Sequence, residues 1–416
     1  MKILIIGSGG REHAIAWKLS QNPKVEKIYA ASGNAGINLL EKGECVNLKT
    51  VDEILEFAEE KKIDLTIVGS EELLVEGIVD KFAGKNLKIF GPDKYAAQLE
   101  GSKVFSKDFM KKYGVKTAEY MTFSDSSKAL EYLADVEFPV VVKASGLAAG
   151  KGVIIAQNKE EAEKAVNEIM VEMRFDNAGS EIVIEEFLDG FEASVLSFTD
   201  SETILTMISA KDHKKIGENE TGLNTGGMGA ICPNPYMTDS VEEAFRKDIL
   251  EPTLKGIKAE KMDFAGIIFF GVMITKKGVY LLEYNMRLGD PETQAVLPLL
   301  ESDLLEIINS CMNKELNKIT LKWKNGFSCC VVASSGGYPE DYKKGYEISF
   351  NEKDGLVFMA GVAEKDGKLL TSGGRVLSTV GLGNTLEEAR KNAYDILENI
   401  NFDGKYYRKD IGKVQI

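Results

Sequence analysis

Three polar side chains at alternate positions of one stretch are the residues best suited to chemistry. Glu283, Asn285 and Arg287 alternate with larger apolar side chains at the end of a strand-like run, residues 278–282. On an extended chain such alternation points the carboxylate, the amide oxygen and the guanidinium to one face. Two hard oxygen ligands suit Mg²⁺, which completes its shell with water and nucleotide phosphates, and an arginine can hold an anion through two hydrogen bonds. The alternative is a solvated strand edge followed by a Gly-Asp-Pro turn.

A second candidate is a glycine-rich loop that carries lysines. Residues 138–144 predict a strand that contains Lys143, and residues 145–152 form a loop with Gly150, Lys151 and Gly152 before the next strand, 153–156. The Walker spacing and the following Ser or Thr are absent, so this is not a P-loop. We expect a hairpin that closes over a triphosphate. The alternative is an exposed hairpin with solvated lysines.

Acidic residues interrupt the next predicted strand, residues 182–188. Glu185 and Glu186 break its apolar run, and Glu192 follows a short turn. A purine ring needs an apolar slot with a few polar partners, and a ribose needs an acceptor for its hydroxyls. We therefore expect Glu185 or Glu186 near a purine ring and Glu192 near the sugar, although charged residues at a strand end are often merely solvated.

Residues 211–229 are the densest polar and glycine-rich segment of the chain. They begin with Asp212, His213 and Lys214 and end in Asn-Thr-Gly-Gly-Met-Gly at 224–229. This composition predicts a loop without helix or strand, and a loop of this length in a compact domain is either disordered or functional. We expect a functional loop. The two histidines of the chain, His13 and His213, are each either ligand contacts or structural residues.

The first hundred residues alternate between predicted strands and helices, which is typical of right-handed βαβ units around a parallel sheet. Glycine loops follow three of the strands, at residues 7–13, 33–36 and 69–71. Such loops meet at the carboxyl edge of a parallel sheet, where ligands bind. Glu12 stands where a dinucleotide fingerprint has its third glycine, and no acidic residue follows the second strand. We expect an anion pocket without NAD, against the alternative of ordinary turns.

The remaining elements predict two further domains. A helix at 99–113 marks a domain junction, and the residues after 322 change to short strands among glycine turns. The other predicted helices are 159–173, 240–260, 303–313 and 386–400, and the other predicted strands are 264–275, 278–284, 327–334, 356–364 and 374–379.

The composition limits the function classes. The chain has 416 residues, a formal net charge of −14 and 44% hydrophobic residues, as an ordinary globular protein of several domains does. The negative charge argues against binding to nucleic acid or to an anionic membrane. Five scattered cysteines predict neither disulfides nor a zinc site. No signal peptide or membrane-spanning run is visible, so we expect a cytoplasmic protein.

Ten motifs in this order closely resemble the phosphoribosylamine–glycine ligase family of the ATP-grasp superfamily, over the whole chain. They are GGREH (9–13), GNAG (33–36), LEGSK (99–103), GLAAGKGV (146–153), EEFLDG (185–190), DHK (212–214), NTGGMG (224–229), GDPETQ (289–294), GGRVL (373–377) and RKDIG (408–412).

The resemblance implies an α/β plus α+β fold in three domains. These are a Rossmann-like domain at 1–103, an ATP-grasp domain at 104–320 with a mobile lid at about 122–190, and a small α+β domain at 321–416. It implies that ATP phosphorylates the carboxylate of glycine, and that the amine of 5-phosphoribosylamine attacks the glycyl phosphate. The products are glycinamide ribonucleotide, ADP and phosphate. We expect a monomer that binds these small molecules and uses Mg²⁺ or Mn²⁺.

The resemblance also implies a role for each matching residue. Arg287, Lys151 and Asp212 are the expected catalytic residues, and Glu283 and Asn285 the expected metal ligands. The residues expected to bind ATP are Lys103, Lys143, Gly150, Lys151, Gly152, Glu185, Glu186, Leu188 and Glu192. The residues expected to bind the other substrates are Gly9, Gly10, Arg11, Glu12, Gly33, Asn34, Glu71, Asp212, His213, Lys214, Asn224, Thr225, Gly226, Gly227, Met228, Arg287, Gly289 and Asp290.

This chain departs from the family pattern at several loop positions. Ser70 and Leu73 replace two prolines, Ser145 an aspartate and Leu223 a proline, which concerns loop rigidity more than the reaction. Strand 269–274 lacks the metal-binding carboxylate of many ATP-grasp enzymes. The competing hypotheses are another ATP-grasp ligase, an NAD-dependent oxidoreductase and a nucleotide-binding regulator without catalysis.

Overall fold

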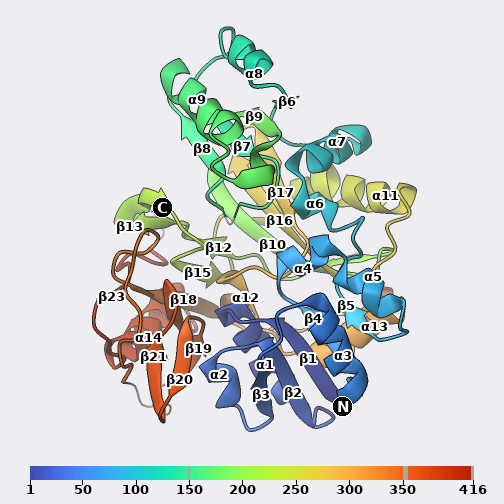
Figure 1. Ribbon diagram of the computed structural model, residues 1–416, viewed down its shortest axis with the longest axis vertical. Coiled ribbons are helices and arrows are strands. Elements are labelled where there is room, and N and C mark those ends of the chain that lie inside the picture. The colour runs from blue at the N-terminus through green and yellow to red at the C-terminus, as the bar shows by residue number, and fades with distance from the viewer. Residues whose placement is uncertain (149, 350–354, 414–416) are drawn as a thin grey trace.

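The computed structural model describes residues 1–148, 150–349 and 355–413 (Figure 1). Its N-terminal part is a parallel sheet in the order β3-β2-β1-β4-β5, as the alternation of strands and helices predicts. The strand order reverses beside β1, where ligands bind in such sheets. The elements are β1 (Lys2–Gly7), α1 (Gly10–Ser20), β2 (Lys27–Ser32), α2 (Ala35–Asn38), β3 (Gly43–Val46), α3 (Val51–Lys61), β4 (Leu65–Val68), α4 (Glu71–Glu76), α5 (Ile78–Ala83), β5 (Ile89–Phe90) and α6 (Gln98–Gly101).

A four-stranded antiparallel sheet, β6-β9-β7-β8, forms the green and teal part at the top of Figure 1. The pair β7–β8 is the expected hairpin, with Val140 opposite Ala156 and Lys143 opposite Val153. Ala149, inside the connecting loop, lies outside the described residues. The elements are α7 (Lys103–Tyr113), β6 (Tyr120–Phe123), α8 (Ser126–Tyr132), β7 (Val140–Ala144), β8 (Val153–Ala156), α9 (Lys159–Val166), a π-helical turn (Asn167–Val171), a 3₁₀ turn (Asp176–Gly179) and β9 (Ile182–Glu186).

A second antiparallel sheet, β11-β10-β16-β17, lies between the N-terminal sheet and the β6-β9-β7-β8 sheet. We call the β6-β9-β7-β8 sheet and its helices the lid, after the expectation for residues 122–190. The register of the second sheet is irregular beside Glu283, because Gly271 pairs with Glu283 and Val272 with Leu281. Such a bulge re-aims a side chain and is frequent at active sites. The elements are β10 (Phe191–Thr199), β11 (Ile204–Thr206), α10 (Asp239–Phe245), a π-helical turn (Arg246–Leu250), α11 (Glu251–Ala259), β16 (Gly266–Thr275), β17 (Gly278–Asn285), α12 (Glu292–Val296), α13 (Leu304–Met312) and a 3₁₀ turn (Leu316–Lys318).

The C-terminal sheet contains two short strands from the middle of the chain, β12 and β15. Its order is β12-β15-β18-β22-β19, and β23 also pairs with β18. Residues near 211 and 230 are thereby fixed to the C-terminal part of the chain. The elements are β12 (Lys211–Asp212), β13 (Lys215–Gly217), a 3₁₀ turn (Glu218–Glu220), β14 (Thr221–Asn224), β15 (Gly229–Cys232), β18 (Phe327–Ser335), β19 (Leu356–Met359), β20 (Val362–Lys365), β21 (Lys368–Thr371), β22 (Arg375–Gly383), α14 (Leu386–Glu398) and β23 (Lys405–Tyr406).

Some expected elements are wrong in detail. Residues 211–229 are not a strandless loop, because they contain β12, the β13–β14 hairpin and the start of β15. Gly222 adopts a positive φ of 80° inside β14, where the register with β13 shifts, so its glycine serves an irregularity of the strand. The helix expected at 99–113 breaks at Ser102, which is extended and caps α7 by accepting a hydrogen bond from Phe105 N–H.

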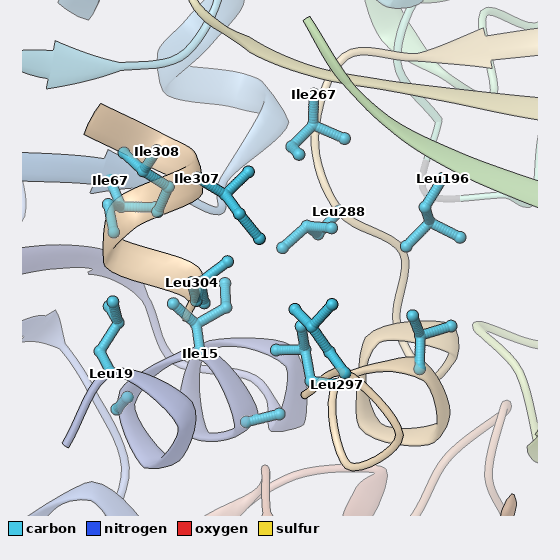
Figure 2. Close-up of a cluster of buried hydrophobic side chains, with 14 of the residues drawn as sticks. Ile15, Leu19, Ile67, Leu196, Ile267, Leu288, Leu297, Leu304, Ile307 and Ile308 are labelled. Atoms are coloured by element: carbon cyan, nitrogen blue, oxygen red, sulfur yellow. The ribbon is translucent and has the colours of Figure 1, made fainter. Parts of the chain in front are cut away.

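One hydrophobic core joins the N-terminal sheet to the elements that follow β17 (Figure 2). Ile15 and Leu19 of α1 face Leu304 of α13 and Leu297, and all four side chains are buried. Each buried side chain of this size contributes about 1.5–3 kcal/mol. The core therefore holds the turn after β1 and the segment around residue 290 at a fixed distance. No helix in the described ranges is long and apolar enough to cross a membrane.

Candidate functional site

One cavity of about 1890 Å³ lies where the lid, the central sheet, the N-terminal loops and the C-terminal sheet meet. Twenty-four of the residues expected to act on ligands line this central cavity. They are Gly9, Arg11, Glu12, Glu71, Lys103, Lys143, Gly150, Lys151, Gly152, Glu185, Glu186, Leu188, Glu192, Asp212, His213, Lys214, Asn224, Thr225, Gly226, Glu283, Asn285, Arg287, Gly289 and Asp290.

The lid end of the cavity has an apolar slot beside cationic groups. Val141, Ile155, Leu188 and Leu282 line the slot. The nearby lysines come from α7, β7 and the hairpin loop, and Lys103 Nζ donates to the Gly146 carbonyl at 3.3 Å. Burial lowers the pKa of Lys103, although acidic neighbours oppose the shift. An apolar slot next to lysines suits a base and its phosphates.

Glu185 lines the cavity and pairs with two lysines, and the placement of Glu185 or Glu186 near a purine ring stays a prediction. The Glu185 carboxylate is buried between two ammonium groups, Lys143 Nζ at 2.7 Å and Lys107 Nζ at 3.0 Å. Burial would raise the pKa of Glu185, but the two lysines outweigh it and lower the pKa. Since one carboxylate serves two cations, burial dominates for Lys107 and lowers its pKa to about 8. Glu185 therefore positions two lysines, and no motif pointed to Lys107.

The strand end carries the three alternating polar residues as predicted. Glu283, Asn285 and Arg287 line the cavity, whereas Tyr284 and Met286 are 2% and 1% exposed in the core behind them. The bulge in β17 and the buried anchors on the far side fix the direction of the polar face.

Glu283 and Asn285 fit a divalent cation by their chemistry. Burial would raise the pKa of Glu283, but Lys214, Lys143 and Lys103 lower it, so the carboxylate is ionised. The described residues contain no cluster of three or more His, Cys, Asp or Glu suited to a metal. Two hard oxygen donors are enough where nucleotide phosphates and water complete the octahedron.

Arg287 is held by two carboxylates. Its Nη2 lies 2.9 Å from Glu100 Oε1 and its Nε 3.3 Å from Glu71 Oε2. Glu100 Oε2 also accepts a hydrogen bond of 2.7 Å from Met286 N–H. Burial would raise the pKa of Glu71, but Arg287 and Arg11 lower it. Glu100 had no predicted role, although it lies inside the LEGSK motif.

Glu12 organises the turn after β1. Its Oε2 accepts a hydrogen bond of 2.6 Å from Gly9 N–H, and its Oε1 lies 2.5 Å from Arg11 Nε. Arg11 Nη1 in turn donates to the Leu288 carbonyl at 3.0 Å. A Cβ at Gly69 would collide with the Glu12 carboxylate, so the glycine permits this close approach. A glutamate here occupies donors at the helix N-terminus that a dinucleotide pyrophosphate uses.

Five expected substrate residues do not line the cavity. Asn34 instead ties segments together, because its Nδ2 donates to the Ser8 carbonyl at 3.0 Å and to the Met359 carbonyl at 2.9 Å. Met228 is fully buried in the C-terminal core. The five residues are Gly10, Gly33, Asn34, Gly227 and Met228.

Both histidines are buried, and each ring accepts a hydrogen bond from a backbone N–H. His213 Nε2 accepts from Gly412 N–H at 3.4 Å, and its Nδ1 faces the Gly229 carbonyl at 3.2 Å. His13 Nδ1 accepts from Met359 N–H at 2.9 Å. Burial lowers the pKa of His13 to about 4 and that of His213 to about 3, so both rings are neutral. His213 also lines the central cavity, and its role in substrate binding stays a prediction.

Asp212 of β12 lines the central cavity. Burial and then the nearby Glu292 raise the pKa of Asp212 well above its ordinary value. Its buried Oδ1 accepts no hydrogen bond from any described residue. A buried acceptor without a donor is costly, and such a group at a cavity is often functional. The cavity therefore contains a buried carboxylate oxygen that has no donor among the described residues.

The C-terminal part adds a residue that had no assigned role. Arg375 Nη1 donates to the carbonyls of Gly226 and, at 2.8 Å, Asp290, and lies 3.3 Å from the Asp290 carboxylate. Burial would raise the pKa of Asp290, but Arg375 and Arg11 lower it. The GGRVL motif contains this arginine, but Arg375 and Asp290 are 85 residues apart in the sequence, so their contact could not be predicted.

Comparisons with known proteins agree with this geometry. Three family profiles match in order: the N domain of phosphoribosylglycinamide synthetase at residues 1–100, its ATP-grasp (A) domain at 101–293 and its C domain at 328–414. A phosphoribosylamine–glycine ligase of Fusobacterium nucleatum is 61% identical, and the match covers 100% of this chain and 99% of that protein.

Solved structures share the architecture. The crystal structure of a phosphoribosylamine–glycine ligase from Thermotoga maritima has a TM-score of 0.88 and 34% identity, covering 99% of this chain and 100% of that one. A biotin carboxylase from Campylobacter jejuni has a TM-score of 0.75 at 17% identity, covering 99% of this chain and 94% of that one, which shows a common fold only. The chain therefore belongs to the phosphoribosylglycinamide synthetase family and has the ATP-grasp fold.

Proposed function

We propose that this chain joins glycine to 5-phosphoribosylamine at the expense of ATP and releases glycinamide ribonucleotide, ADP and phosphate. The observation that carries the proposal is the meeting of Glu283, Asn285 and Arg287 with the lysines of the lid in one cavity. The names of its relatives support the choice of substrates. A division into domains at 1–103, 104–320 and 321–416 belongs to the same proposal.

The reaction proceeds through glycyl phosphate. A carboxylate is a poor electrophile, because its oxygen leaves badly. One glycine oxygen attacks the γ-phosphorus of ATP and ADP leaves, so that the acyl carbon carries a phosphate. The amine of phosphoribosylamine then attacks that carbon, loses a proton and expels phosphate. No covalent bond to the protein is needed.

The residues at the lid end bind ATP in this proposal. Lys103, Lys143 and Lys151 hold the phosphates, and the apolar slot holds the base with Glu192 beside the ribose. Glu283 and Asn285 hold Mg²⁺ or Mn²⁺, which neutralises charge on the phosphates when bound. Arg287 stabilises negative charge on the transferring phosphoryl group or on the glycine carboxylate.

The residues at the other end bind the two remaining substrates. Arg11, Glu71 and the N-terminal glycine turn line the cavity, and so do Asn224, Thr225 and Gly226. Asp212 lines the same cavity and has a buried oxygen without a donor among the described residues. Because its pKa is raised, it is suited to accept the proton that the attacking amine loses.

Phosphate release tests this proposal. The purified chain is mixed with ATP, Mg²⁺ or Mn²⁺, glycine and freshly generated phosphoribosylamine, and each component is omitted in turn. We expect release only when all are present, with glycinamide ribonucleotide detected by mass spectrometry. Release with another carboxylate would assign a different ATP-grasp ligase, and ATP binding without release would assign a regulator.

The remaining properties belong to the same proposal. We propose a monomer in the cytoplasm, consistent with five cysteines that are all free. Light scattering after size exclusion measures the mass, and a dimer would refute the first statement.

A further inference from the structure

A small hairpin stands at the mouth of the central cavity and has almost no support from its own part of the chain. Its strands β13 (Lys215–Gly217) and β14 (Thr221–Asn224) pair only with each other among the described strands. Its turn, residues 218–220, is exposed, and Leu223 of β14 is 50% exposed. A two-stranded hairpin alone is marginally stable in water. Its position therefore depends on contacts made from elsewhere.

Those contacts come from Arg408, near the end of the chain. Its guanidinium pairs with both oxygens of Asp410, at 2.9 Å from Nε and 2.8 Å from Nη2. Nη1 donates to the Lys215 carbonyl at 2.9 Å, and Nη2 lies 2.7 Å from Glu220 Oε1. The side chain is only 1% exposed. One planar group thus grips both the first strand and the turn of the hairpin.

Two neighbouring bonds add to this clamp. Asn219 N–H donates to Asp410 Oδ2 at 2.8 Å, and Tyr406 O–H donates to the Ile216 carbonyl at 2.7 Å. Asn219 and Glu220 have positive φ angles of 56° and 55°, which are unfavourable for these residues and persist only under external restraint. The clamp supplies that restraint at the turn.

The hairpin carries residues of the cavity at both of its ends. Lys214 precedes it and pairs with Glu192 at 2.7 Å, and Asn224 and Thr225 end it on the cavity wall. Thr225 N–H donates to the Lys214 carbonyl at 2.8 Å and closes the base of the hairpin. A shift of the hairpin therefore moves the wall that faces Asp212.

We propose that Arg408 is a positioning residue for the acceptor-substrate side of the site. It does not touch substrate, because Nε, Nη1 and Nη2 are all engaged by protein groups. It holds the hairpin so that Lys214, Asn224 and Thr225 keep their places beside Asp212. On the ATP side, the clamp does not contact Lys103 or Lys143, and the hairpin reaches the proposed ribose residue Glu192 only through the ion pair of Lys214. This assignment rests on the proposed function for the identity of the acceptor.

Kinetics and hydrogen exchange of the full-length enzyme test the assignment. Arg408→Lys keeps the charge but loses the planar fork, and Glu220→Gln removes only the ion pair to the turn. We expect Arg408→Lys to raise KM for phosphoribosylamine about 10-fold or more and KM for ATP by about 3-fold or less. Amide exchange of residues 215–227 accelerates, while that of β9, residues 182–186, stays as in the wild type. Glu220→Gln shows the same pattern, with smaller changes.

The control is Lys409→Ala, which removes an exposed cation one position away and leaves both readouts unchanged. An Arg408→Lys enzyme with normal exchange in 215–227 and normal KM values overturns the proposal. A uniform rise in exchange, with parallel losses for ATP and acceptor, also overturns it and assigns Arg408 a general stabilising role. If the wild type releases no phosphate with these substrates, the proposed function fails, while the exchange data still decide whether the clamp holds the hairpin.

Discussion

The buried carboxylate of Glu185 shared by Lys107 and Lys143 leads to a quantitative prediction. At separations of 3.0 Å and 2.7 Å, an effective dielectric constant of about 20 gives each pair an attraction of about 6 kcal/mol before desolvation. Lys143 leaves this carboxylate at a modest cost when it binds a phosphate, because Lys107 continues to neutralise Glu185. Lys107 is thus the counter-ion that makes Lys143 available.

Lys107→Met removes that counter-ion and leaves Glu185 to Lys143 alone. We expect the dissociation constant for ATP to rise about 10- to 100-fold, which equals about 1.4–2.7 kcal/mol. Stability falls by less than the about 3–5 kcal/mol of a fully orphaned buried charge, because Lys143 remains paired. Titration calorimetry with MgATP measures the affinity, and thermal melting checks the fold.

A double-variant cycle isolates the cause. Glu185→Gln removes the negative charge, so Lys107→Met combined with Glu185→Gln should bind ATP within about 3-fold of Glu185→Gln alone. The matched control is Lys111→Met, an exposed lysine four residues later on the same helix. A folded Lys107→Met protein that binds ATP as the wild type does would refute the reasoning.

Three further predictions concern the metal, the pH and the contact between the ends of the chain. Glu283→Gln should lower phosphate release more than about 100-fold with little change in melting temperature; near-normal activity would contradict the metal assignment. The pKa of His13 is about 4 in the folded protein and about 6.5 in the unfolded chain. Below pH 6.5 the unfolded chain therefore binds a proton that the folded protein does not, and the free energy of unfolding falls as the pH falls from 6.5 towards 4. As the pH falls from 6.5 to 5, the free energy of unfolding measured in urea should therefore drop by about 1.6 kcal/mol more for the wild type than for His13→Asn, and equal slopes would contradict this. Phe358→Ala, which empties a fully buried ring site beside His13 and Trp17, should cost about 3–5 kcal/mol in the same unfolding assay; a loss below about 1 kcal/mol would show that the site collapses.

Local patterns were sufficient for the framework and for most of the site. The alternation at Glu283, Asn285 and Arg287 and the glycine loops at the sheet edge depend on strand geometry alone, so they could be predicted. The strands β12 and β15 could not be predicted, because β15 pairs with β18, about a hundred residues later, and β12 pairs with β15. Propensity within a segment carries no information about such a partner.

The ion-pair partners of the buried charged residues could not be predicted from the sequence either. Glu185 was predicted beside a ligand because it interrupts an apolar strand, but Lys107 and Lys143 meet it from two other elements. Arg287 was likewise expected to meet an anion, and it meets Glu71 and Glu100 in this structure. A sequence shows where a buried charge lies but not which opposite charge the fold brings to it.

The hydrogen bonds that Asn34 and His13 make with the backbone of Met359 have a consequence for the synthesis of the chain. Asn34 and Met359 are 325 residues apart, so at about 5–20 residues per second the ribosome needs about 16–65 s between them. During this interval the first domain can fold its sheet, but the turn after β1 lacks its remote partner. The growing chain therefore cannot assemble the complete site until its last quarter has emerged.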